Sequence, residues 1–157
     1  MSYAPHMELI TELMPLLRRD FETALDLNPD TTEPVVDGEW LELNASYTLI
    51  RGSGERLVPC FPVFAERGRY DTQAIGKLPV IFGGMYEFDT DLVNSGHGIT
   101  LGAPVCVADV TAAGGTKKGL IVCAGGATSH FVVGWCTRLP ASGKVRILHT
   151  GYTYLTT

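Results

Sequence analysis

The spacing of apolar residues divides the chain into two parts with different periods. In the first part, apolar side chains recur at intervals of three and four, which is the period of an amphipathic α-helix. These positions are Met7, Ile10, Leu13, Met14, Leu17, Phe21, Ala24 and Leu25. Pro15 lies inside this stripe, and proline is tolerated in a first helical turn but costly in a helix interior. The pattern predicts either a helix from near Pro15 to about Leu27 or a longer helix that is kinked at Pro15.

From Val35 onward the helical period is absent. Short runs of β-branched and aromatic residues follow one another instead, and glycines separate them. With 18 glycines in the chain, this pattern is typical of an antiparallel sandwich or barrel. We therefore predict an all-β fold, a small antiparallel β-barrel or β-sandwich over residues 35–157, preceded by an N-terminal arm of residues 1–34 that contains a short α-helix.

Two stretches of the β part resemble each other. The sequence LVPCFPVFAERG from Leu57 compares with LGAPVCVADVTA from Leu101, and each is followed by a lysine, an apolar run and a glycine pair, at 77–84 and 118–126. A duplication would explain the likeness, as would the chance similarity of strands separated by glycine. If it is a duplication, it predicts two similar strand pairs, each made of a strand, a polar hairpin and a returning strand.

Length, composition and charge fit one globular domain beside an arm. The chain has 157 residues, of which 45% are hydrophobic, and a formal net charge of -5 at pH 7. Lysine and arginine are scattered, which argues against nucleic acid and anionic membranes as partners. No apolar run approaches the roughly 20 residues that span a bilayer, and no basic stretch precedes an apolar signal core. We expect a protein that is made and kept in a cytoplasm unless a larger assembly carries it out.

The four cysteines favour buried thiols over a metal site. Cys60, Cys106, Cys123 and Cys136 each lie inside an apolar or strand-like segment, and no two of them form a Cys-x-x-Cys pair. Zinc sites usually bring cysteines together at such short spacings. The even number leaves disulfides open if the protein ends up outside a cell.

The stretch MYEFDTDLV, residues 85–93, places Glu87, Asp89 and Asp91 at every second position. On a strand these carboxylates would share one face, and carboxylate oxygens are the ligands that calcium and magnesium prefer. However, the 12-residue loop of an EF-hand is missing, and no histidine stands at a spacing familiar from transition-metal sites. We therefore favour a strand end that caps the following loop or contacts a partner, and we expect no metal.

Residues used in catalysis occur, but not in a catalytic pattern. Ser129 and His130 are adjacent, and His97 and His149 are available, yet no G-x-S-x-G elbow is present. The glycine-rich TAAGGTKKG lacks the spacing and the following helix that would hold a phosphate. We therefore expect no catalytic residue and no cofactor.

Several features indicate assembly with other proteins. The apolar stripe belongs to an arm, and Tyr152 and Tyr154 share one face of a polar C-terminal strand that can form an exposed edge. Together with the acidic stretch, these features predict the following interface residues: Leu13, Leu17, Phe21, Glu87, Asp89, Asp91, Tyr152 and Tyr154.

Six segments occur in a characteristic order between about Gly38 and Thr153. They are GEWLEL, PVFAERGRYD, LPVIFGGMYEFDTD, GITLGAPVCVA, FVVGWC and VRILHTGYT, and the acidic EFDTD is the most distinctive part. In this order they resemble the head decoration, or cement, proteins of tailed bacteriophages. The apolar stripe of the N-terminal arm lies outside the resemblance.

The resemblance implies a non-enzymatic virion structural protein that binds the outer surface of the phage head lattice and stabilises it. Such a protein is assembled in the cytoplasm of the host bacterium, and its partners are the major capsid protein and copies of itself. A symmetric lattice offers sites for a trimer or a dimer, and an arm that orders on binding suits such a clamp. The alternatives are a phage neck, tail or baseplate structural protein, and a small-molecule or carbohydrate-binding β module.

Overall fold

In the computed structural model, the described residues are 7–26, 34–51, 60–64, 76–93, 97–109, 118–122, 130–139, 143–151 and 153–155. Every helix or strand within these ranges is a β-strand, which confirms the predicted all-β class. The strands are β1 (Met7–Glu22), β2 (Trp40–Leu43), β3 (Leu49–Ile50), β4 (Cys60–Pro62), β5 (Lys77–Thr90), β6 (Pro104–Asp109), β7 (Lys118–Val122), β8 (His130–Val132), β9 (Gly134–Arg138), β10 (Val145–His149) and β11 (Thr153–Leu155).

The strands form one large sheet and two small ones. The large sheet has the order β1-β5-β10-β9-β6-β7, and the small sheets have the orders β3-β2-β4 and β11-β8. All neighbouring strands in these sheets run antiparallel. Within the described residues, β1 and β7 end the large sheet and do not pair with each other. The sheet is therefore open, and the predicted alternative of a closed barrel is wrong.

The predicted N-terminal helix is also wrong, because residues 7–22 form the strand β1. This strand pairs with β5 from Met7 opposite Thr90 to Glu22 opposite Lys77. Pairing with a neighbouring strand outweighs the helical spacing of the apolar residues. The domain boundary predicted at residue 34 stays a prediction, although β1 belongs to the same sheet as strands beyond it.

The burial of β1 shows why its sequence resembles a helix. Leu9 and Leu16, which are outside the helical stripe, pack against the larger core, whereas Leu13 and Leu17 inside the stripe are exposed. Four register shifts interrupt the strict alternation of a strand. Pro15 fits at the sheet edge, where its missing N–H breaks no ladder bond.

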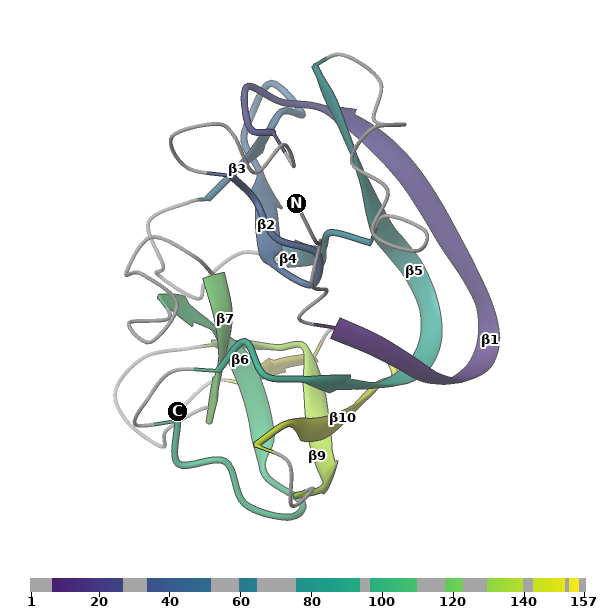
Figure 1. The fold of residues 1–157 in the computed structure, drawn as a ribbon, viewed down its shortest axis with the longest axis vertical. Coiled ribbons are helices and arrows are strands. Elements are labelled where there is room, and N and C mark those ends of the chain that lie inside the picture. The colour runs from purple at the N-terminus through teal and green to yellow at the C-terminus, as the bar shows by residue number, and fades with distance from the viewer. Residues whose placement is uncertain are drawn as a thin grey trace.

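β5 links two hydrophobic cores. Its second half, with Tyr86 and Phe88, belongs to the larger core, and its first half, with Leu78 and Val80, belongs to the smaller core against the sheet β3-β2-β4. Figure 1 shows β1 and β5 running side by side and bending together from one half of the molecule to the other. The pair thereby forms a curved ribbon along both cores.

The middle of β5 contains a glycine whose backbone conformation other residues adopt rarely. Gly84 has a φ of 112°, and a Cβ built there would lie 2.7 Å from the carbonyl oxygen of Pro15. Only glycine allows both the positive φ and this close approach of β1. Gly84 therefore allows β1 and β5 to approach each other closely beside Pro15.

The two strand pairs expected from a duplication are present to different degrees. β6 and β7 pair from Val105 opposite Val122 to Asp109 opposite Lys118. Beyond β4, a single antiparallel bridge joins Val63 to Val80 of β5. Of the two returning strands, β7 therefore pairs regularly with β6, the strand before it. The other returning strand, β5, pairs mainly with β1 and β10 and not with β4.

Candidate interaction surface

Large apolar side chains on the outer strand β1 are exposed to solvent. The exposed fraction is 53% for Leu13, 52% for Met14, 62% for Leu17 and 36% for Ile10. We call these four residues the β1 patch. Apolar side chains gathered on one exposed segment are typical of a surface that binds a partner. The β1 patch is therefore the candidate site of interaction.

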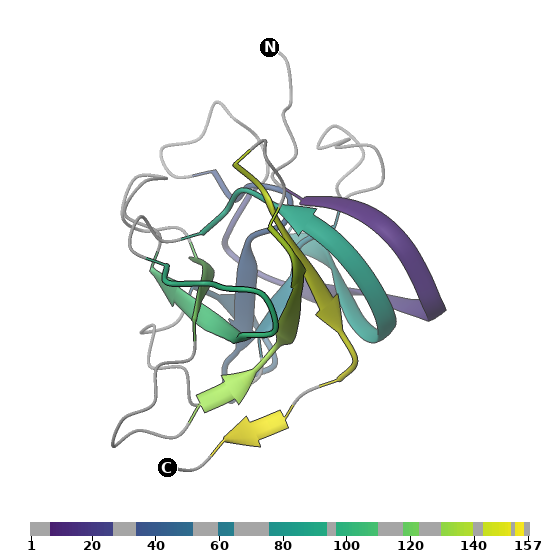
Figure 2. The same ribbon diagram turned by 90° about the horizontal axis from the view of Figure 1, so that it is seen from below.

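The position of β1 explains why these side chains are not buried. β1 pairs with β5 on one side, and no strand in the described residues pairs with its other side. Figure 2 shows β1 at the outer margin of the molecule, with β5 between it and the rest of the large sheet. The register shifts between Leu9 and Arg18 turn side chains out of strict alternation. β1 thus carries apolar residues toward both the cores and the solvent.

Charged residues of opposite sign flank the β1 patch. Glu8 precedes the patch and Glu12 lies within it, between Ile10 and Leu13. Two arginines, Arg18 and Arg19, follow the patch, and two acidic residues, Asp20 and Glu22, come after them; all six side chains are exposed. The carboxylate of Glu12 accepts a hydrogen bond from the backbone N–H of Leu16 at 2.8 Å. The patch therefore has acidic residues before and within it, and a pair of arginines directly after it.

Aromatic rings support the basic end of the patch. The guanidinium carbon of Arg19 lies 4.7 Å from the ring centre of Phe21 and 5.6 Å from that of Phe82. The two rings are themselves 5.5 Å apart, and Phe21 is buried in the smaller core. A cation over an aromatic face is attracted to it. Phe21, predicted as an interface residue, is thus a core residue that positions Arg19.

The acidic stretch makes its main contacts within the chain. Asp89 is largely buried, and its carboxylate accepts two hydrogen bonds from Arg146, from Nε at 2.8 Å and from Nη2 at 3.0 Å. The pair forms because the register of β5 and β10 places these residues opposite each other. The hydrogen bond to Asp89 raises the pKa of Arg146. A bidentate pair of this kind fixes the alignment of two strands.

The two other carboxylates of the stretch lie in different surroundings. Glu87 accepts a hydrogen bond from the Thr137 hydroxyl of β9 at 2.9 Å, and Asp91 is exposed beyond the end of β5. The Thr90 hydroxyl accepts a hydrogen bond from the backbone N–H of Leu92 at 3.1 Å. In the described part, it is therefore the threonine that caps the backbone after β5. A contact of Asp91 with a partner stays a prediction.

The C-terminal tyrosines are only partly placed by the structure. Tyr152 lies outside the described residues. The backbone of Tyr154 belongs to β11 and pairs opposite Phe131 of β8, while its side chain is outside the described part. The predicted C-terminal strand is confirmed, and the interface role of both tyrosines stays a prediction.

The larger core contains a buried polar cluster around His149. Its Nδ1 lies 2.5 Å from the carbonyl oxygen of Val133, and its ring stacks on Tyr86 at 4.9 Å between centres. Burial lowers the pKa of His149 and raises the pKa of Tyr86. The hydroxyl of Tyr86 and Nε1 of Trp40 have no hydrogen-bond partner among the described residues. Both titratable side chains are therefore held neutral inside the core.

The described residues contain no group of three His, Cys, Asp or Glu side chains that could hold a metal ion. Cys60, Cys106 and Cys136 are buried thiols, as predicted, and Cys123 lies outside the described ranges. Burial raises the pKa of Cys136, which keeps this thiol protonated. No helix in the described part is long and apolar enough to span a membrane.

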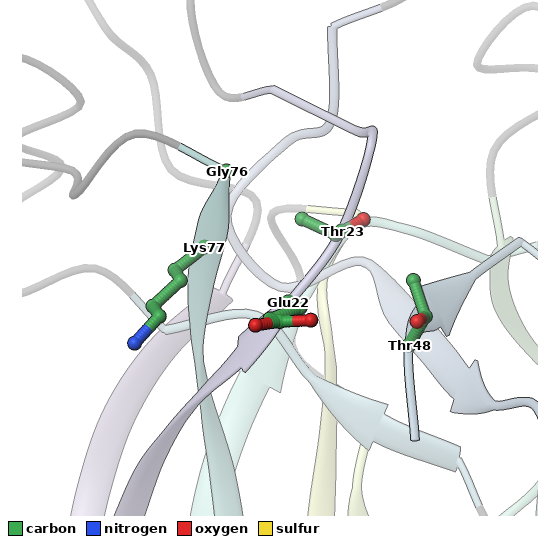
Figure 3. A pocket seen from close by; sticks show the side chains of 5 residues that line it. All are labelled: Glu22, Thr23, Thr48, Gly76 and Lys77. Atoms are coloured by element: carbon green, nitrogen blue, oxygen red, sulfur yellow. The ribbon is translucent and has the colours of Figure 1, made fainter. Parts of the chain in front are cut away.

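A shallow depression of about 400 Å³ lies where β1 and β5 end their pairing. It is lined by Glu22, Thr23, Thr48, Gly76 and Lys77 (Figure 3). Three of the five lining residues are exposed, and none of the five has a purely hydrocarbon side chain. Ligand sites usually combine an apolar enclosure with a few convergent polar groups. We therefore assign no ligand to this depression.

Two of the four residues of the β1 patch, Leu13 and Leu17, are predicted interface residues, and that role stays a prediction. Ile10 and Met14 belong to the same stripe without that role. The signal for all four was their place in an apolar run interrupted by Pro15. No local signal points to Arg146 as the partner of Asp89, because 57 residues separate them in the chain.

Comparisons of the chain with models of protein families, with curated proteins and with solved structures found no match.

Proposed function

We propose that the protein is a non-enzymatic structural component of a virion, a capsid decoration protein that binds the outer surface of a phage head lattice and stabilises it. The observation that carries this proposal is the β1 patch, in which an edge strand exposes Leu13, Met14 and Leu17. Apolar side chains displayed in this way favour association with another protein surface. The partners we propose are the major capsid protein and further copies of this chain.

The two cores suit a protein that must keep its shape under load. The β1–β5 ribbon runs along both cores, and the Asp89–Arg146 pair ties β5 to β10. A rigid surface loses little conformational entropy on binding, so more of the contact energy stabilises the complex. This property supports a role as a clamp between capsid subunits.

Stabilisation of the head would follow from mass action. A protein that binds only the expanded lattice stabilises that lattice by about 2.7 kcal/mol per site at a free concentration of one hundred times Kd. Many copies bound over one shell add these contributions. The decorated head would therefore resist the outward pressure of packed DNA better than the bare head.

Sedimentation with purified phage particles tests the proposal. Expanded heads, unexpanded heads and isolated tails of the phage that encodes the chain are each incubated with the protein and pelleted. Saturable binding to expanded heads alone is expected. Binding to tails but not to heads would favour a neck, tail or baseplate protein, and binding to none of the particles would remove the virion role.

A further inference from the structure

We propose that the β1 patch is the surface through which two copies of this chain pack against each other, antiparallel about a twofold axis between Leu13 and Met14. This inference rests on the assembly role proposed above and names the first partner of the patch. A decorating unit would then be a preformed dimer. Three features of β1 favour this contact: the order of its charges, the interruptions of its edge and the support of Arg19 by aromatic rings.

The charge order along β1 selects the orientation of the second copy. The strand has Glu8 before the patch, Arg18 and Arg19 directly after it, and Asp20 and Glu22 at its end. An antiparallel second copy can bring Glu8 of one strand against Arg19 of the other. A parallel copy would bring like charges together, which is unfavourable. The charges therefore favour a twofold arrangement.

The position of the axis follows from the same charges and from the patch. With the axis between Leu13 and Met14, the four residues of the β1 patch meet one another in pairs and Glu8 meets Arg19 at both ends, while Glu12 lies opposite Pro15. The opposed pairs are Glu8 with Arg19, Ile10 with Leu17, and Leu13 with Met14. Because the axis is twofold, each pair occurs twice in the contact.

The irregular edge of β1 indicates contact through side chains instead of a continuous hydrogen-bond ladder. Pro15 has no N–H to donate, and the pairing register of β1 shifts on both sides of it. Prolines and bulges are the features that prevent open-ended pairing of edge strands. A twofold contact uses the same surface on both copies and closes after two of them. The edge of β1 therefore permits a dimer and disfavours the addition of further copies into a fibre.

Arg19 is held in place for this contact before a partner arrives. Its guanidinium group lies over the rings of Phe21 and Phe82, at 4.7 and 5.6 Å from their centres. Stacking fixes the side chain and leaves the edges of the guanidinium plane for hydrogen bonds. A carboxylate such as Glu8 of a second copy is the group that such an edge binds.

The oligomeric state of the purified protein, measured by analytical ultracentrifugation without phage particles, tests the inference. The wild type is expected to be a dimer at tens of micromolar. Leu13→Lys should raise the dissociation constant of the dimer at least tenfold, because it places two ammonium groups at the axis. Leu101→Lys is the matched control, since Leu101 is 70% exposed and lies outside β1.

A charge exchange tests the antiparallel orientation. Glu8→Lys and Arg19→Glu should each weaken the dimer several-fold at low salt, because each one brings like charges together. The double variant should bind more tightly than either single variant, since it reverses the sign of each pair between the copies. It also loses the ion pair of Glu8 with Lys144 and the contacts of Arg19 with the rings, so the restoration is expected to be partial. A double variant that is weaker than both single variants would overturn the antiparallel arrangement.

A cysteine at the axis gives a second readout if the lysine variant does not fold. Leu13→Cys should form a disulfide-linked dimer on mild oxidation, whereas Leu101→Cys should not. Equal cross-linking of both variants would contradict a contact at the β1 patch.

The outcomes separate this inference from the proposed function. A wild type that is monomeric or trimeric overturns the dimer, and its binding to expanded heads would leave the function standing. A dimer that binds no phage particle overturns the function and supports the contact proposed here.

Discussion

At the scale of single residues, the buried polar groups of the larger core determine how the protein responds to pH. His149 is buried against Tyr86, and its Nδ1 contacts the carbonyl oxygen of Val133. A carbonyl oxygen only accepts hydrogen bonds, so Nδ1 carries the proton of the neutral ring. Burial disfavours a second proton and lowers the pKa of His149, and the bond to Val133 only partly opposes this shift.

This arrangement predicts a loss of stability in mild acid. Below its ordinary pKa of about 6.5 the unfolded chain binds a proton at His149 that the folded protein does not bind. The contribution of His149 to the free energy of unfolding is therefore complete above about pH 6.5 and decreases as the pH falls through this value. Urea unfolding of the wild type and of His149→Gln between about pH 8 and pH 5 measures the effect. Equal slopes for the two proteins would contradict it.

The hydroxyl of Tyr86, which has no hydrogen-bond partner among the described residues, leads to a second prediction. A buried donor without a partner lowers stability, and Tyr86→Phe removes this donor and keeps the ring that packs on Phe88 and His149. The free energy of unfolding should stay unchanged or rise by about 1 kcal/mol. Chemical denaturation tests this expectation. A loss of more than about 1 kcal/mol would show that the hydroxyl makes a hydrogen bond to a bound water.

At the scale of elements, the curved β1–β5 ribbon is the feature that the sequence predicted least well. A stripe of apolar residues at spacings of three and four predicted a helix, yet residues 7–22 form a strand. The bulges of β1 produce such spacings within a strand, and their positions depend on the pairing with β5. The residue that argued against a long helix was Pro15, which fits at the edge of a sheet.

The close approach of β1 to Gly84 predicts that alanine lowers the free energy of unfolding more at Gly84 than at its neighbour Gly83. Gly84→Ala should lower the free energy of unfolding by about 1 to 3 kcal/mol, because its φ is positive and its Cβ would meet the carbonyl oxygen of Pro15. Gly83→Ala is the control, since its Cβ would contact only the flexible side chain of Leu17, at 3.3 Å. Thermal unfolding of both variants tests the difference. A larger loss of stability in Gly83→Ala than in Gly84→Ala would contradict this explanation of the role of Gly84.

At the scale of the whole molecule, the sequence predicted that the fold consists of β-strands but not the order in which the strands pair in the sheets. Short apolar runs between glycines marked most of the strands after Val35, because strand formation depends on local patterning. The open order of the large sheet and the pairing of β1 with β5 depend on contacts between distant segments. The same limit hid the pair of Asp89 and Arg146. Leu13 and Leu17 stand out in the sequence as apolar residues of one local segment, but their exposure depends on the pairing of β1 with β5.

The proposed capsid role depends on the whole surface and is tested most directly by imaging the particle. An image reconstruction of mature heads assembled with and without the protein would show where it lies. The account predicts additional density of the size of this chain on the outer surface of the expanded shell, at symmetry-related sites. Density confined to the neck or tail, or identical heads in both preparations, would contradict it.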